Sequence, residues 1–210
     1  VKMWEGRIES RESGDKSRES GDNFAVNWFE NRLNEVKTDM EKLYKDFRLS
    51  EALKNIYSLI WDDFCSWYLE WIKPGYEQPI EKDVYDKTVY FFEELIQLLH
   101  PFMPFVTEEI YHQLKERKDG DDLTIKQTSE TGSIKPEILL QGKLLKEIIT
   151  SLREARVKNQ LKQKDKVKLH IGTSTLEHYK NFENILARQV NAESISYVTE
   201  AIPQTIALVI

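Results

Sequence analysis

The sequence predicts a mainly α-helical protein, an antiparallel helical bundle followed by a small α/β subdomain. Apolar residues recur at spacings of three and four between residues 29 and 114, which is typical of helices that bury one face. Proline or glycine marks short connections at 73–75 and 101–104. After residue 122 the pattern changes, and apolar residues alternate with polar ones at 167–171, which indicates a strand. The domains that we expect are a helical bundle at 1–122 with a flexible loop at 9–22, a linker at 123–136 and the α/β subdomain at 137–210.

The N-terminal region contains a polar tandem repeat. Residues 9–22 include no apolar residue, and the hexapeptide Ser-Arg-Glu-Ser-Gly-Asp occurs at 10–15 and again at 17–22. Such a segment buries too little surface to offset its conformational entropy, so we expect a flexible loop. The chain opens on Val1 and closes on the apolar run 205–210, whereas free termini are usually polar. We therefore expect the chain to be a fragment of a longer protein.

Four helices are expected to form the bundle. The first helix carries an apolar stripe whose residues are spaced four and three apart, and Asp22 or Asn23 can cap its N-terminus. The second begins at Ser50 and ends at 73–75. The third spans about 80–100, and the fourth begins near Pro104, a residue suited to a first helical turn. Long helices with short connections pack as antiparallel neighbours. The stripe of the first helix comprises Phe29, Leu33, Val36, Met40, Leu43 and Phe47.

The second half of the chain predicts a small α/β unit. Its central element is a long helix at about 137–159, with leucine and isoleucine facing inward. The other elements that we expect are a short strand at 123–125, a strand at 167–171, a helix at 175–190, and strands at 195–198 and 206–210.

Composition limits the class of protein and its compartment. The chain has 210 residues, of which 40% are hydrophobic and 31% charged, so it is not a fully disordered chain. No apolar run approaches the ~18 residues that a membrane span requires, and we expect no membrane partner. We expect no secretory signal, because no basic stretch followed by an apolar one occurs, and the single cysteine, Cys65, has no internal disulfide partner. These features favour the reducing cytoplasm.

Positive charge is concentrated between residues 143 and 168. This stretch holds nine basic and three acidic residues, a balance of +6, although the whole chain carries −6. A basic patch on an acidic protein indicates contact with a polyanion, and such contacts give affinity and orientation rather than base specificity. The alternative is a solvated helix end, where basic residues also complement the macrodipole. The candidates for phosphate contacts are Arg153, Arg156, Lys158 and Lys162.

The sequence offers no catalytic constellation. Its four histidines lie far apart, without the close pairing of a zinc helix site, and no glycine-rich phosphate loop or serine elbow occurs. Cys65 and the tryptophans Trp61, Trp67 and Trp71 lie on an aromatic helix and are interpreted as core. We therefore expect no catalytic, cofactor-binding or metal-binding residue in this chain.

Three residue runs resemble the anticodon-binding bundle of the valyl-tRNA synthetases, which are class I aminoacyl-tRNA synthetases. They are 47–53, 62–74 and 100–111, the last reading His-Pro-Phe-Met-Pro-Phe-Val-Thr-Glu-Glu-Ile-Tyr. The resemblance is strong over about 24–114 and continues more weakly over 137–171, where Arg153 and Arg156 occupy the family's arginine-bearing helix end. Leucyl and isoleucyl relatives share only the looser pattern. The family often has a glycine or proline turn after that helix, which Asn159 to Lys164 replace here.

This resemblance implies tRNA binding without aminoacylation by this chain. The family's catalytic domain, which uses ATP, carries two signature motifs that are absent here, since His170-Ile171-Gly172-Thr173 matches only three of four positions. The implied partners are valine tRNA isoacceptors and, on the same full-length chain, the catalytic and editing domains and a C-terminal coiled coil. The alternatives are the equivalent leucyl or isoleucyl domain, or a helical protein-interaction module without a nucleic-acid role.

The resemblance also assigns roles to individual residues. Single-stranded loops are read by stacking and by hydrogen bonds to base edges. The entry helix at the start of the chain is the expected base reader, through Lys2, Trp4 and Arg7. Arg32 is expected to reach either tRNA or an acidic partner in the core, with neither favoured. The tRNA-binding candidates are therefore Lys2, Trp4, Arg7, Arg32, Arg153, Arg156, Lys158 and Lys162.

Overall fold

A computed structural model divides the chain into two units. The first unit comprises residues 1–13 and 29–134, and the second comprises 14–28 and 135–210. At residues 9 and 16–23 only the backbone is described. The residues that the structure describes are 4, 7–9, 16–75, 77–162, 164–173, 176–199, 202–203 and 205–208.

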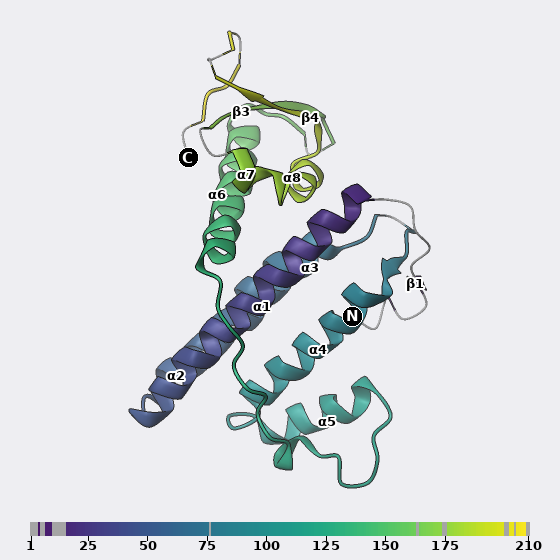
Figure 1. The fold of residues 1–210 in the computed structure, drawn as a ribbon, viewed down its shortest axis with the longest axis vertical. Coiled ribbons are helices and arrows are strands. Elements are labelled where there is room, and N and C mark those ends of the chain that lie inside the picture. Colours follow the sequence, from purple (N-terminus) through teal and green to yellow (C-terminus); the bar gives the residue numbers. More distant parts are fainter. Residues whose placement is uncertain are drawn as a thin grey trace. The chain divides into compact units, whose positions relative to one another are not determined.

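The first unit is the helical bundle that the sequence predicts (Figure 1). A two-residue parallel pairing joins β1 to β2, with Ile8 opposite Ile80. Its elements in chain order are β1 (Ile8–Glu9), the part of α1 (Lys16–Lys45) from Phe29 onward, α2 (Leu49–Ser58), η2 (Leu59–Tyr68), α3 (Leu69–Ile72), β2 (Ile80–Glu81), α4 (Lys82–Leu99), α5 (Pro104–Leu114) and η3 (Leu123–Ile125).

An aromatic cluster forms the centre of this core. The ring of Phe29 lies 5.0–5.1 Å, centroid to centroid, from those of Phe64, Tyr68 and Phe91, so α1, η2 and α4 meet at one point. Phe29, Tyr68 and Phe91 are fully buried. Tyr68 also keeps its hydroxyl satisfied inside the core, because it shares a hydrogen bond of 2.8 Å with Thr88. Of the predicted stripe of the first helix, Phe29, Leu33, Val36 and Met40 are buried, as their spacing requires. The stripe was wrong at its end, because α1 stops at Lys45: Leu43 is only half-buried and Phe47 is 87% exposed.

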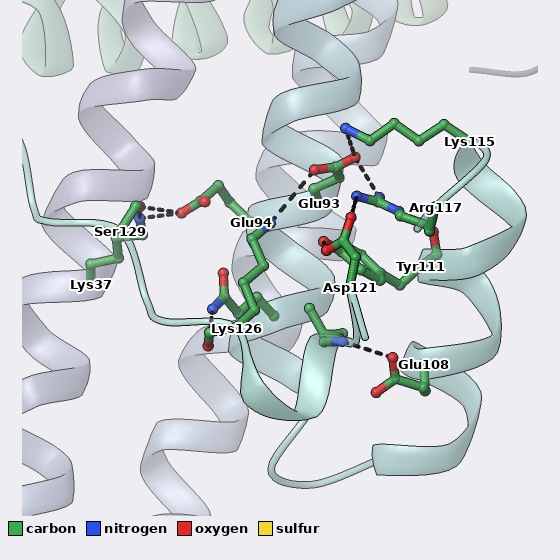
Figure 2. Close-up of polar contacts among 12 residues, drawn as sticks. Lys37, Glu93, Glu94, Glu108, Tyr111, Lys115, Arg117, Asp121, Lys126 and Ser129 are labelled. Atoms are coloured by element: carbon green, nitrogen blue, oxygen red, sulfur yellow. Dashed lines mark hydrogen bonds and ion pairs between the residues drawn. The ribbon is translucent and has the colours of Figure 1, made fainter. Parts of the chain in front are cut away.

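The connection after η3 lies against the bundle and is held by polar contacts. Lys37 of α1 forms a buried ion pair with Glu94 of α4, and the Ser129 hydroxyl bonds both groups, at 2.5 Å from Lys37 Nζ and 2.7 Å from Glu94 Oε2 (Figure 2). Gln97 donates to the Lys126 carbonyl, and the Gly132 amide donates to the Asn34 side chain. Residues 126–132 therefore belong to the packed first unit.

A second charged cluster fastens the segment after α5. The Glu93 carboxylate forms ion pairs with Arg117 at 2.7 Å, with Lys115 at 2.9 Å and with Lys126 at 3.6 Å (Figure 2). Arg117 also stacks on the Tyr111 ring at 3.4 Å. Burial opposes the ionisation of Glu93, but the bonds from Lys115 and Arg117 outweigh it and lower the pKa of this carboxyl.

Tyr111 makes the first unit sensitive to alkali. Burial, followed by the hydrogen bond that its hydroxyl donates to Asp121, raises the pKa of Tyr111 from 10.0 to about 12. The folded state favours the neutral phenol, so this stabilisation is complete below pH 10 and is lost as pH rises toward 12. A difference of two pKa units corresponds to roughly 3 kcal/mol of unfolding free energy.

Denaturant titrations from pH 9 to 12 are expected to show this loss in the natural chain. Tyr111→Phe removes the titrating group, so its free energy of unfolding is expected to fall less over the same interval. Equal alkaline losses in the two proteins would show that Tyr111 is not the group responsible.

The second unit packs two parallel strands on helices. Its elements are α6 (Pro136–Lys158), β3 (Val167–Gly172), α7 (Leu176–Lys180), α8 (Glu183–Gln189) and β4 (Ala192–Val198), with residues 16–28 of α1. Strand β3 pairs with β4 from Val167↔Ala192 to Gly172↔Val198. The core is built from Phe24, Trp28, Leu145, Ile148, Ile149, Phe182, Ile185, Leu186 and Val190, all of them buried.

Several predicted boundaries need correction. Helix α1 begins at Lys16, so the prediction of a loop through residue 22 was wrong for 16–22, while residues 10–15 lie outside the described residues. Residues 123–125 form a 3₁₀ turn rather than a strand, because Glu108 accepts hydrogen bonds from the Leu123 and Thr124 amides. The helix predicted at 175–190 is interrupted at 181–182, and residues 206–208 form no strand.

Candidate nucleic-acid interface

The basic segment, residues 153–168, lies in three successive parts of the second unit. It includes the last turns of α6, the turn at 159–166 and the first residues of β3. Among the residues that the structure describes, none of its lysine side chains forms an ion pair. Their charge is thus available to an external anion. The exposed basic residues are Arg153, Lys158, Lys162, Lys164, Lys166 and Lys168.

Arg156 holds the turn together instead of projecting freely. Its guanidinium donates to three main-chain carbonyls, those of Val190 at 3.1 Å and of Lys162 and Asp165 at 2.6 Å each. Since these bonds occupy both terminal nitrogens, its first role is to shape the loop that carries the lysines. Arg153 reaches the Gln189 side chain at 3.0 Å, yet its side chain remains exposed.

The end of α6 uses a backbone conformation that usually favours glycine. Gln160 has φ +57°, and the Leu161 amide donates to the Arg156 carbonyl, which together form a left-handed helix C-terminus. The Asp165 carboxylate then accepts the Lys162 amide, and the Asn191 side chain donates to the Lys164 carbonyl. The sequence therefore forms the turn without the glycine or proline that is common in the resembling family.

Strand β3 extends the exposed basic surface. Val167, Leu169 and Ile171 are half-buried, whereas the intervening Lys168 and His170 are exposed, which follows from the two-residue period of a strand. His170 is paired across the sheet with Ser196, and its Nδ1 lies 2.6 Å from the serine hydroxyl.

The N-terminal candidates are only partly described. Lys2 lies outside the described residues, Trp4 is half-buried and Arg7 is exposed. Arg32 lies in the first unit, where it donates to Asp63 at 2.9 and 3.0 Å and also pairs with Glu35. Burial tends to lower the pKa of Arg32, but the two carboxylates outweigh it and raise that pKa. Arg32 thus has the acidic partner that was one of its two expected roles.

An exposed aromatic pair was missed by the sequence interpretation. Tyr57 and Trp61 are 62% and 59% exposed, and their rings stack at 6.4 Å between centroids with a tilt of 13°. Trp61 and Cys65 were interpreted as core, and that was wrong, because both are exposed. In the structure Leu59 and Asp63, two residues to either side of Trp61, are buried, which places Trp61 on the opposite face. The sequence did not signal this, because an aspartate does not mark a buried face.

A family profile described as "Anticodon-binding domain of tRNA ligase" matches residues 26–171. The chain belongs to this family. The match includes the bundle and the basic segment through β3, so the resemblance given by the three sequence runs is confirmed. Among its described residues, this anticodon-binding domain has no helix that is both long and apolar enough to cross a membrane.

Curated relatives of the domain are valine–tRNA ligases. The chain is 41% identical over 176 residues to that of Parabacteroides distasonis, covering 84% of this chain and 20% of the relative. It is 41% identical over 176 residues to that of Porphyromonas gingivalis, with the same shares, and 34% identical over 173 residues to that of Bacillus subtilis, covering 79% and 18%. The chain thus spans about a fifth of the length of these relatives.

Proposed function

We propose that this domain binds the anticodon arm of valine tRNA isoacceptors as part of a cytoplasmic valine–tRNA ligase. The reaction itself, with ATP, belongs to a catalytic domain elsewhere on the full-length chain, together with an editing domain and a C-terminal coiled coil. The observation that carries the proposal is the unpaired lysine charge of the basic segment within a family of anticodon-binding domains. Such charge positions a phosphate backbone without reading its sequence.

The candidates divide by what their side chains do in the folded chain. Lys158 and Lys162 are exposed and without ion pairs in the described part of the structure, so we propose them as direct phosphate contacts. Arg153 is a third contact, and Arg156 positions the turn through its three carbonyl bonds. For Lys2, Trp4 and Arg7 we retain the proposal of base contact, which rests on the resemblance alone. Arg32 is left out, because Asp63 and Glu35 occupy it.

Salt-dependent binding tests the phosphate contacts. Filter binding of valine tRNA at several salt concentrations is expected to give a linear fall of log affinity with log salt. Lys158→Ala with Lys162→Ala removes two contacts and is expected to reduce the slope by about one to two.

A matched control removes two lysines of the first unit that are also exposed, Lys54→Ala with Lys118→Ala. It changes the net charge by the same amount and is expected to leave the slope unchanged. If the slope falls equally in both double variants, the change in net charge explains the effect, and Lys158 and Lys162 are not specific phosphate contacts. A natural chain without any salt-dependent binding would contradict the proposed function itself.

A further inference from the structure

A histidine and two carboxylates converge where the segment after α5 returns to that helix. Glu108 and His112 lie four residues apart on α5, so their side chains share one helical face. Asp122 comes from the end of the loop. One ligating atom from each of the three residues lies within 4.8 Å of the others. His112 Nε2 lies 3.3 Å from Glu108 Oε1 and 3.1 Å from Asp122 Oδ1.

The Glu108 carboxylate has one acceptor position left after its hydrogen bonds to Leu123 and Thr124. A carboxylate offers about four acceptor positions. Glu108 Oε2 accepts both the Thr124 amide at 3.0 Å and the Thr124 hydroxyl at 2.8 Å, and Oε1 accepts the Leu123 amide at 2.7 Å (Figure 2 shows Glu108). The remaining position is on Oε1, the oxygen that lies 3.3 Å from His112 Nε2.

These bonds also orient the carboxylate, because its two oxygens are held by the amides of Leu123 and Thr124 and by the Thr124 hydroxyl. Asp121, next to Asp122, is fixed by the Tyr111 hydroxyl at 2.9 Å, which restrains the end of the loop. Hydrogen bonds of this kind orient metal ligands in proteins.

We propose that Glu108, His112 and Asp122 form a binding site for one divalent transition-metal ion, with Zn²⁺ the best fit. Tetrahedral zinc with ligands at 2.0–2.1 Å places neighbouring ligand atoms about 3.3 Å apart, close to the two separations here. Imidazole nitrogen suits Zn²⁺ and other transition metals, whereas Mg²⁺ and Ca²⁺ prefer all-oxygen sites. Three protein ligands leave a fourth position for water.

The site was not predictable from histidine spacing. A helical zinc pair is sought as two histidines four apart, and here the first of that pair is a glutamate. The third ligand lies ten residues further on, beyond a loop whose path depends on the contacts of Arg117 with Glu93 and the Tyr111 carbonyl. Bound metal would join both ends of that loop and stabilise the folded first unit by mass action.

Calorimetric titration of this chain with zinc chloride tests the proposal. The natural chain is expected to bind one Zn²⁺ ion that millimolar Mg²⁺ does not displace, and its thermal midpoint is expected to rise. His112→Ala and Asp122→Asn are each expected to weaken that binding more than tenfold and to abolish the rise.

The matched control is His178→Ala, which removes a histidine of the second unit that also faces a glutamate, at 3.9 Å. It is expected to leave zinc binding unchanged. Both test residues are exposed, so both variants are expected to fold, and circular dichroism before titration checks this. Absence of zinc binding in the natural chain, or equal affinity in the His112→Ala, Asp122→Asn and His178→Ala proteins, would overturn the proposal.

Discussion

Replacing Lys37 by methionine is expected to lower the free energy of unfolding by about 3–5 kcal/mol, because it leaves a buried carboxylate without its cation. The Lys37 and Glu94 side chains are only 4% and 3% exposed, and Ser129 is the hydroxyl that bonds both. After the substitution, Glu94 retains this hydroxyl but no longer has a balancing charge. Urea unfolding followed by circular dichroism measures the loss.

A double variant separates charge from packing. Lys37→Met with Glu94→Met removes both charges and keeps apolar volume between α1 and α4, and such replacements of buried ion pairs are often neutral. We expect the double variant to recover most of the stability lost in the single one. If the two proteins are equally destabilised, side-chain packing rather than the unpaired charge explains the effect.

Gly142→Ala is expected to destabilise the second unit, against the usual preference of helices for alanine. A Cβ at this position of α6 would lie 2.1 Å from Trp28 Cδ1 and Nε1, and Trp28 is 1% exposed. Helix propensity favours alanine by about 1 kcal/mol, while overpacking of a filled core costs about 1–3 kcal/mol, or more for so close an approach. We expect a net loss of about 2 kcal/mol in chemical denaturation.

Gly172→Ala provides the control within the same unit. There the nearest atom to a new Cβ is the Val198 carbonyl oxygen at 3.7 Å, an ordinary contact, so stability is expected to change little. A Gly142→Ala protein as stable as the Gly172→Ala protein would show that the indole of Trp28 can move aside.

Hydrophobic periodicity predicted most of the fold. The stripe from Phe29 to Met40 predicts the buried face of a helix, and the alternation at 167–171 predicts the inner face of a strand. The structure has the helix and the strand at these positions, with these faces turned inward. The 3₁₀ turn at 123–125 was not predictable, because it depends on a carboxylate fifteen residues earlier in the chain. The pattern of residues within 123–125 holds no information about a contact with a residue so far away in the sequence.

The candidate interface was predictable in position but not in the division of roles. Counting charges located the basic segment, but it could not tell that Arg156 would donate to three carbonyls while Lys158 stays exposed. That distinction follows from the path of the turn, which the Gln160 conformation and Asn191 determine. Similarly, residue type alone misplaced Trp61 in the core, because the buried face of that helix includes the polar Asp63.

The parallel pairing of β3 with β4 makes the lysine-bearing strand dependent on a distant part of the chain. Parallel neighbours cannot be joined by a tight hairpin, and the crossing here passes through α7 and α8. Two strands alone are not stable in water, so β3 pairs stably with β4 only when the intervening helices have folded. Proteolysis or a frameshift between 173 and 198 would therefore remove the scaffold of the basic surface while leaving every one of its cations in the polypeptide.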